Sequence, residues 1–422
     1  MKMKILKNFH LDKTFTINTS SLFILNALNF LLTIIVLPKL ITTFGIKGWG
    51  EITFAQVVIN YFIWIIDWSF PQYACKQISI YENNEKKRNQ FFITARTSQL
   101  ILFFISSIFL SLYGFIFSNN QLVYNYSVLI LFGSFLQTYW YLNGREKIYE
   151  TAFIQLLNKF FFAFFVFAII KKGDDISTYF FYFGICNIIT GIFCTIRIVI
   201  QYNETFKIGN FNKSIRLIKK SFILFNSAII GNITNSAIPF IISSFYSIEN
   251  LGIYNITDRI KNISIQILNP LSNSIFPKMS RNYYHDKEKA NKKFLNFLLI
   301  FSLIGFFIFL ILNINLDLII SYFFKEKVNG INLIARILTL SFLSNIIYES
   351  FVNQYLIINN LFKEINKIKL LVLFTTILIG IPLIYFKGIL GAALTNLTYE
   401  ITGLLFAINS FIKTKNKKYF SY

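Results

Sequence analysis

The sequence predicts an all-α protein that crosses a membrane about twelve times, and three observations support this prediction. Hydrophobic residues make up 55% of the 422 residues and aromatic residues 18%, whereas only 14% are charged. Soluble domains carry about 25% charged residues. Mean hydropathy is +0.56, and apolar stretches of about 20 residues, long enough for a helix to span a bilayer, follow one another along the chain. These observations exclude a soluble enzyme, a nucleic-acid-binding protein and an outer-membrane barrel, whose strands alternate over about 10 residues.

Twelve apolar segments supply the expected helices, because a chain in lipid must pair all its backbone polar groups internally. The expected spans are residues 16–38, 51–75, 91–117, 121–143, 148–170, 177–201, 219–246, 252–276, 294–323, 331–358, 367–386 and 388–412. No soluble domain is inserted between them. The longest polar stretch, residues 201–220, lies at the midpoint of the chain. We therefore predict two six-helix halves, residues 1–205 and 221–422, joined by a cytoplasmic linker over 206–220.

Basic residues alternate between the loops of this layout. The chain holds 41 Lys+Arg against 19 Asp+Glu, which gives a net charge of +22. If the N-terminus is cytoplasmic, 27 basic residues fall in the tails and in every second loop, and only seven fall in the loops between. Cytoplasmic loops are enriched in Lys and Arg, so we expect an even number of spans with both termini in the cytoplasm. The net charge then reflects membrane topology rather than nucleic-acid binding.

The two halves share a short internal repeat. In residues 38–50 and again in residues 239–252, a proline precedes a phenylalanine by six positions, and a glycine follows six or seven positions later. The offset is about half the chain. In both halves the proline falls near the outer end of the first helix and the glycine opens the second. Transporters are often built from such repeats, with the substrate site between them near the middle of the membrane.

The sequence offers no residues for metal or covalent chemistry. Its three cysteines lie in apolar segments without metal-ligand spacing, and its two histidines fall in predicted loops. It contains no glycine-rich phosphate loop and no nucleotide-binding domain. We therefore expect no cofactor, and an ion gradient (H⁺ or Na⁺) or the flow of substrate as the energy source.

Four short motifs resemble those of a known family. They are residues 44–56 (FGIKGWGEITFAQ), 66–70 (IDWSF), 251–254 (LGIY) and 276–280 (FPKMS). In order, spacing and placement at helix ends they are similar to signatures of the bacterial polysaccharide flippases, which handle O-antigen and capsule repeat units. These flippases belong to the multidrug/oligosaccharidyl-lipid/polysaccharide exporter superfamily. Ser69 stands where the family usually has glycine, which puts local packing in doubt but not the resemblance.

The resemblance implies a fold, a substrate and a location. The fold would be two pseudo-symmetric six-helix bundles around a central cavity that opens alternately to each side. The substrate would be an undecaprenyl-pyrophosphate-linked oligosaccharide, moved from the inner to the outer leaflet of the bacterial cytoplasmic membrane. The implied partners are this polyprenyl-pyrophosphate-linked glycan, membrane lipids and the polysaccharide polymerase machinery, with no nucleic acid.

Ionisable residues inside the predicted spans are the candidate site residues, because burying a charge in lipid is costly without a function. The predicted substrate-binding cations, which would offset the buried pyrophosphate, are Lys159, Arg259, Lys261 and Arg336. The predicted ion-coupling or charge-balancing acids are Asp67, Asp258, Glu349 and Glu400. No metal site is expected.

Some of these residues have an alternative interpretation. Asp258 and Lys261 are three positions apart and can simply pair on one helix face, which leaves Arg259, on another face, as the better ligand. Asp67 can instead hold a hydrogen bond to a neighbouring helix. Three further cations near the cytoplasmic boundary are expected to extend to the interface: Lys76, Arg96 and Arg197. Three asparagines are candidates to meet sugar hydroxyls: Asn232, Asn235 and Asn262.

Three other functions fit the sequence less well than the flippase. A cation-coupled small-molecule exporter of the same superfamily should have an acidic or apolar cavity, whereas the predicted deep residues include four cations. A membrane glycan polymerase normally needs a sizeable outer loop with catalytic basic residues, and the predicted outer loops are short. A membrane scaffold without transport activity does not explain the buried charges.

Overall fold

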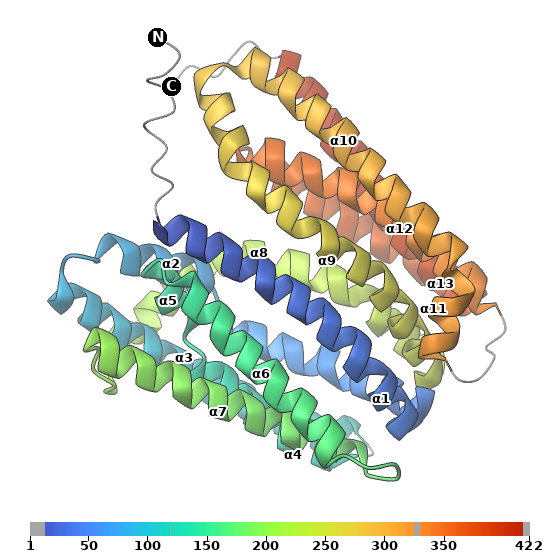
Figure 1. Ribbon diagram of the computed structural model, residues 1–422. Coiled ribbons are helices and arrows are strands. Elements are labelled where there is room, and N and C mark those ends of the chain that lie inside the picture. Colours follow the sequence, from blue (N-terminus) through green and yellow to red (C-terminus); the bar gives the residue numbers. More distant parts are fainter. Residues whose placement is uncertain (1–12, 119, 325–329, 417–422) are drawn as a thin grey trace. The chain divides into compact units, whose positions relative to one another are not determined.

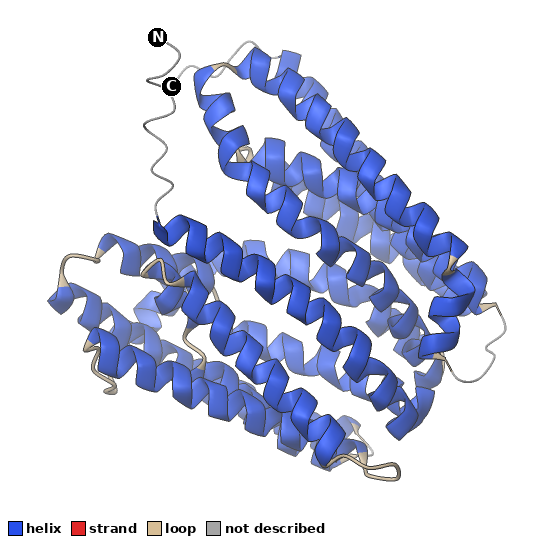
Figure 2. Cartoon of the chain, in the orientation of Figure 1, coloured by secondary structure: helices blue, strands red, loops and turns tan. Residues whose placement is uncertain are grey.

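A computed structural model describes residues 13–118, 120–324 and 330–416, and every regular element within them is a helix (Figures 1 and 2). The elements are α1 (Lys13–Asp67), α2 (Phe70–Ile80), α3 (Glu85–Phe117), α4 (Gln121–Leu136), α5 (Tyr139–Gly144), α6 (Ile148–Ala168), α7 (Ile176–Tyr202), α8 (Phe211–Phe245), α9 (Ile248–His285), α10 (Lys287–Ile314), α11 (Leu316–Phe323), α12 (Ile331–Phe351), the π-helix η1 (Val352–Ile357) and α13 (Phe362–Asn416).

Two pairs of predicted spans are continuous helices with a kink between them. The first two spans share α1, which bends at Gly45 (φ 73°, ψ 174°). The last two share α13, which bends at Gly388 (φ 57°, ψ −133°). Only glycine adopts such backbone angles without strain, because it has no Cβ. The chain therefore reverses from one span to the next at these glycines without a conventional loop.

Other predicted spans are interrupted. The span over 121–143 is divided into α4 and α5 at Gln137 and Thr138, and the span over 294–323 into α10 and α11 at Asn315. Within the described residues, seven helices are long and apolar enough to cross a membrane. The remaining elements are shorter or more polar. α4, for example, has only 16 residues. The chain is an all-helical, multi-pass membrane protein, as the sequence predicted.

The chain forms two compact units that divide at unexpected positions. Unit 1 comprises Met1–Lys39 and Val58–Ala228, and unit 2 comprises Leu40–Val57 and Ile229–Tyr422. The middle of α1 thus groups with the second half of the sequence, and the later division falls inside α8. The layout of two six-helix domains with a separate linker stays a prediction.

The connector between α7 and α8 is fixed within unit 1. Glu204 is only 2% exposed, and its carboxylate accepts hydrogen bonds from Arg88 of α3 and from the hydroxyl of Tyr141 of α5. In the first half of α8, the ring of Phe225 stacks on that of Trp68 with the ring centroids 3.9 Å apart. These contacts explain why the first part of α8 belongs to unit 1.

The position of Arg96 differs from the one expected from the sequence. It was expected to extend to the cytoplasmic interface, but it is only 4% exposed. Its guanidinium lies 4.0 Å from the ring centroid of Phe135 and 5.1 Å from that of Phe206. The expectation was wrong because α4 and the connector cover this part of α3. Lys76 and Arg197 are exposed.

In unit 2, the two glycines of the internal repeat meet where α1 crosses α9. A methyl group on Gly50 would overlap the carbonyl oxygen of Ile248, and one on Gly252 would overlap the carbonyl oxygen of Ile46. The contact is reciprocal, because each glycine faces the carbonyl four positions before the other. The absence of side chains at both positions is what allows the two backbones to approach so closely.

Candidate functional site

Unit 2 contains a cavity of about 610 Å³ lined mainly by polar side chains. The lining residues come from four helices and from η1. They are Thr234, Ile238 and Pro239 of α8; Tyr254, Asn255, Asp258, Lys261, Asn262, Ile265 and Asn269 of α9; Asn345 and Glu349 of α12; Asn353 of η1; and Asn396, Tyr399 and Glu400 of α13. We call this space the unit 2 cavity. Six of its lining residues are asparagines, and four are charged.

Helical spacing explains how these side chains reach one space. Residues three or four positions apart lie on the same helix face, and Asn345, Glu349 and Asn353 follow one another at intervals of four. Asn353 belongs to η1, which Gln354 ties to α9. The Gln354 side-chain amide donates a hydrogen bond of 2.8 Å to the carbonyl oxygen of Ser272 in α9. π-helical turns are rare and frequently mark functional sites.

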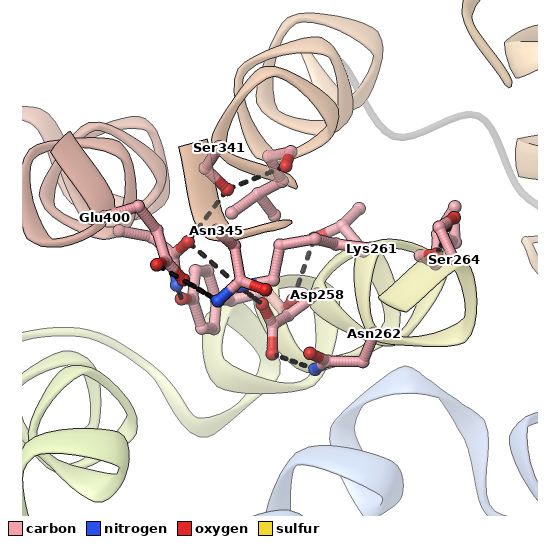
Figure 3. A network of polar contacts seen from close by, with 12 residues as sticks. Asp258, Lys261, Asn262, Ser264, Ser341, Asn345 and Glu400 are labelled. Atoms are coloured by element: carbon pink, nitrogen blue, oxygen red, sulfur yellow. Dashed lines mark hydrogen bonds and ion pairs between the residues drawn. The ribbon is translucent and has the colours of Figure 1, made fainter. Parts of the chain in front are cut away.

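One buried cation organises the polar contacts of the cavity (Figure 3). The Lys261 ammonium is 2.9 Å from the Asp258 carboxylate and donates to Asn396 Oδ1, also at 2.9 Å. Asn262 donates to the other carboxylate oxygen of Asp258 at 2.8 Å, and the Ser341 hydroxyl donates to Asn396 at 2.9 Å. Lys261 is 4% exposed. A charge buried this deeply is tolerated only when it is paired and hydrogen-bonded.

The other two carboxylates of the cavity hydrogen-bond to amides, and the nearest cations, Lys369 for Glu349 and Lys261 for Glu400, act on them only at longer range. Glu400 is 2% exposed, and both its oxygens accept hydrogen bonds of 3.1 Å from the side-chain amide of Asn345. Glu349 accepts one of 3.1 Å from Asn353. Among the described residues, neither glutamate forms an ion pair. The cavity therefore holds three carboxylates and a single ammonium group, an acidic balance.

Arg259 lies on a different face of α9 from Lys261, as the sequence spacing indicated. Its guanidinium is 5.3 Å from the ring centroid of Trp49, and it donates to Asn255 Oδ1 at 3.3 Å. Trp49 donates to the same oxygen at 3.2 Å. Arg259 is not among the side chains that line the cavity. In this structure it connects α9 to the middle of α1.

The eight candidate residues occupy different places in the structure. Four of them line the unit 2 cavity: Asp258, Lys261, Glu349 and Glu400. The pairing of Asp258 with Lys261, which the sequence left as an alternative, is present. Arg336 is exposed on α12, outside the cavity lining, and Lys159 is exposed on α6 in unit 1. Asp67 is partly buried at the end of α1, also in unit 1. The transport roles of all eight stay predictions.

Sequence reasoning missed most of the asparagines. Of the three proposed, Asn262 lines the cavity and Asn232 does not, whereas the side chain of Asn235 lies outside the described residues. The five others of the lining were not identified: Asn255, Asn269, Asn345, Asn353 and Asn396. Their spacing relative to the buried acids was the available signal. Within the described residues, no group of three or more His, Cys, Asp and Glu side chains is placed to hold a metal ion.

Comparisons with known proteins point to one family. Residues 15–283 match the model of the family described as "Polysaccharide biosynthesis protein". The "Putative O-antigen transporter" of Escherichia coli (strain K12) is 23% identical over 401 residues, which cover 92% of this chain and 95% of that protein.

Solved structures show the same fold. The inward closed conformation of the lipid II flippase MurJ aligns with a TM-score of 0.73 at 17% identity, covering 94% of this chain and 87% of that one. An inward-facing multidrug resistance transporter of the MATE family, in the MOP superfamily, aligns with a TM-score of 0.64 at 12% identity, covering 94% and 96%.

Proposed function

Because the chain belongs to the polysaccharide biosynthesis protein family, we propose that it translocates undecaprenyl-pyrophosphate-linked oligosaccharide repeat units. Transport would run from the inner to the outer leaflet of the bacterial cytoplasmic membrane. The protein is a membrane transporter rather than an enzyme, and it is involved in polysaccharide or O-antigen biosynthesis. The fold that it shares with a lipid II flippase supports the choice of a lipid-linked substrate.

The observation that carries the proposal is the asparagine-rich lining of the unit 2 cavity. A sugar hydroxyl both donates and accepts hydrogen bonds, and so does a side-chain amide. Six asparagines and two tyrosines around about 610 Å³ therefore suit a glycan headgroup. Such a polar space is costly inside a membrane protein unless it serves function.

Transport would proceed by alternating access between two pseudo-symmetric bundles, with both termini in the cytoplasm. The polyprenyl tail would stay in lipid while the headgroup moves through a central cavity. Lys261 lines the unit 2 cavity, which supports it as the cation that binds the substrate. Protonation of Asp258 would release its ammonium to bind a phosphate oxygen. Asp258, Glu349 and Glu400 are therefore the proposed acceptors of H⁺ or Na⁺ in an ion-coupled cycle.

The test measures which leaflet holds the glycan in a deletion strain, using a membrane-impermeant glycan probe on oriented vesicles. We expect the lipid-linked glycan to accumulate on the cytoplasmic leaflet and the wild-type gene to reverse this. Normal outer-leaflet display with unpolymerised repeats would refute the proposal and indicate a polymerase.

A site variant sharpens this test. Asn353→Leu removes an amide from the cavity wall, and losing one or two hydrogen bonds of about 1 kcal/mol each should slow translocation by about tenfold. Asn212→Leu, at an exposed position in the first turn of α8, is the matched control and should transport normally. Equal translocation rates in both variants would show that the unit 2 cavity is not on the transport path.

A second candidate function is export of small organic cations by the same fold. The acidic balance of the unit 2 cavity favours it, because three carboxylates face one ammonium group. The deletion strain decides between the two functions. Increased sensitivity to toxic organic cations with normal glycan display would support the exporter.

A further inference from the structure

Building on the proposed function, we propose that the unit 2 cavity selects repeat units without carboxylate groups. It would accept neutral sugars and amino sugars and reject glycans that contain uronic acids. The inference depends on the charges of the cavity wall and on which of them already have partners.

The only cation in the described cavity lining is already engaged. The Lys261 ammonium contacts the Asp258 carboxylate and Asn396 Oδ1, both at 2.9 Å. It is 4% exposed, so a sugar carboxylate would have to displace Asp258 to reach it. Displacement would leave Asp258 as a third carboxylate of the cavity without an ion pair, which is strongly unfavourable. While Asp258 is ionised, Lys261 therefore offers no accessible partner for an anionic sugar. Once Asp258 is protonated, the released ammonium is occupied by the pyrophosphate that every repeat unit carries, so a sugar carboxylate again finds no cation.

The remaining charges of the wall repel an anion. Glu349 and Glu400 accept hydrogen bonds only from Asn353 and Asn345 and form no ion pair within the described part of the chain. A uronate entering this space would lose its hydration and meet two carboxyl groups, each of which repels it in the ionised form. Repulsion is stronger in the low-dielectric interior of a protein than in water. A protonated amino group in the same place would be attracted instead.

The same wall is well suited to uncharged sugars. Asn345, Glu349 and Asn353 lie at intervals of four residues, so amide, carboxylate and amide groups follow one another along one face. Carboxylates accept hydrogen bonds from sugar hydroxyls, and asparagine amides can donate and accept. Glu349 is the more accessible of the two unpaired acids, because Glu400 is almost fully buried. We therefore assign Glu349 as the main determinant of this selectivity.

The experiment compares two lipid-linked tetrasaccharides in vesicles that contain the purified protein. They differ at one sugar, which is glucose in one and glucuronic acid in the other, so only a CH₂OH group becomes COO⁻. We expect the wild type to translocate the glucose form at least about tenfold faster, since like charges in a desolvated site disfavour binding strongly. Glu349→Gln should reduce this ratio several-fold. Glu249→Gln, an exposed carboxylate in the first turn of α9, is the control and should preserve it.

The outcomes separate this inference from the proposed function. Equal rates for the two glycans, or faster transport of the uronate, would overturn the selectivity and leave the flippase function standing. Transport of neither glycan would overturn the flippase function and this inference with it. The comparison of the two glycans uses the wild-type protein. The inference can therefore be refuted even if the Glu349→Gln protein folds poorly.

Discussion

The buried ion pair of the unit 2 cavity gives the sharpest prediction about stability. Lys261→Met removes the ammonium but keeps the apolar stem of the side chain. Asp258 then retains the amide of Asn262 but loses its counter-ion, and Asn396 loses its cationic donor. Breaking a buried pair by removing one partner costs about 3–5 kcal/mol. The Asp258 side chain is 21% exposed, and the water that reaches it reduces our expectation to about 2–4 kcal/mol.

A double-mutant cycle tests this reasoning. Thermal unfolding would be followed in lipid nanodiscs for Lys261→Met, for Asp258→Asn and for the double variant. We expect the double variant to recover most of the stability lost by Lys261→Met, because no uncompensated charge remains. Lys289→Met is the matched control. Lys289 and Asp286 form an ion pair with the same i,i+3 spacing at 3.1 Å, but on an exposed surface, so no measurable change is expected.

Additive losses in the double variant would refute the coupling between Lys261 and Asp258. A loss in Lys289→Met equal to that in Lys261→Met would show that burial is not the source of the effect.

Two further predictions concern helix packing and helix capping. Gly50→Ala should lower the free energy of unfolding by about 1–3 kcal/mol, because the added methyl overlaps a carbonyl of α9. Gly231→Ala, whose methyl would meet only a flexible lysine chain at 3.5 Å, should be neutral or stabilising in the same unfolding measurement, and the reverse order would contradict the crossing. Hydrogen bonds from the side chain and backbone N–H of Ser177 hold the pKa of Asp175, the N-cap of α7, below its ordinary value. Its contribution to stability is therefore present above the unfolded-state pKa and is lost as the pH falls through the lower folded-state pKa. Melting temperatures between pH 2 and 6 should depend less steeply on pH in Asp175→Asn, and an unchanged slope would refute this.

The arrangement of helices was predictable to the extent that it depends on local sequence. Each expected span is mostly helical, because apolar length and helical periodicity are properties of contiguous residues, although three are interrupted, at residues 68–69, 137–138 and 315. The kinks were less predictable from the sequence. The sequence placed a break between spans near Gly45 and near Gly388, but it predicted loops there and not a single kinked residue in a continuous helix. The positive φ angles of these two glycines are seen only in the structure.

The composition of the candidate site was only partly predictable. The cost of burying charge identified Asp258, Lys261, Glu349 and Glu400 from the sequence alone. The unit 2 cavity does not have the cationic character expected of the site, because Lys261 is the only predicted cation in its lining. The spacing placed Arg259 on another face of its helix. It could not reveal that Trp49, more than 200 positions away in the chain, occupies that face.

By itself, the sequence determined that this protein is a helical membrane transporter, it pointed to the four charged residues that line the unit 2 cavity, and it showed that two glycines occupy equivalent positions in its halves. Tertiary structure alone decided which buried charges share a space, and therefore the sign of the charge that remains there. The physical reason is that hydropathy and helix periodicity act between neighbours in the chain. The electrostatic character of a cavity depends on side chains that helix crossings bring together from distant positions.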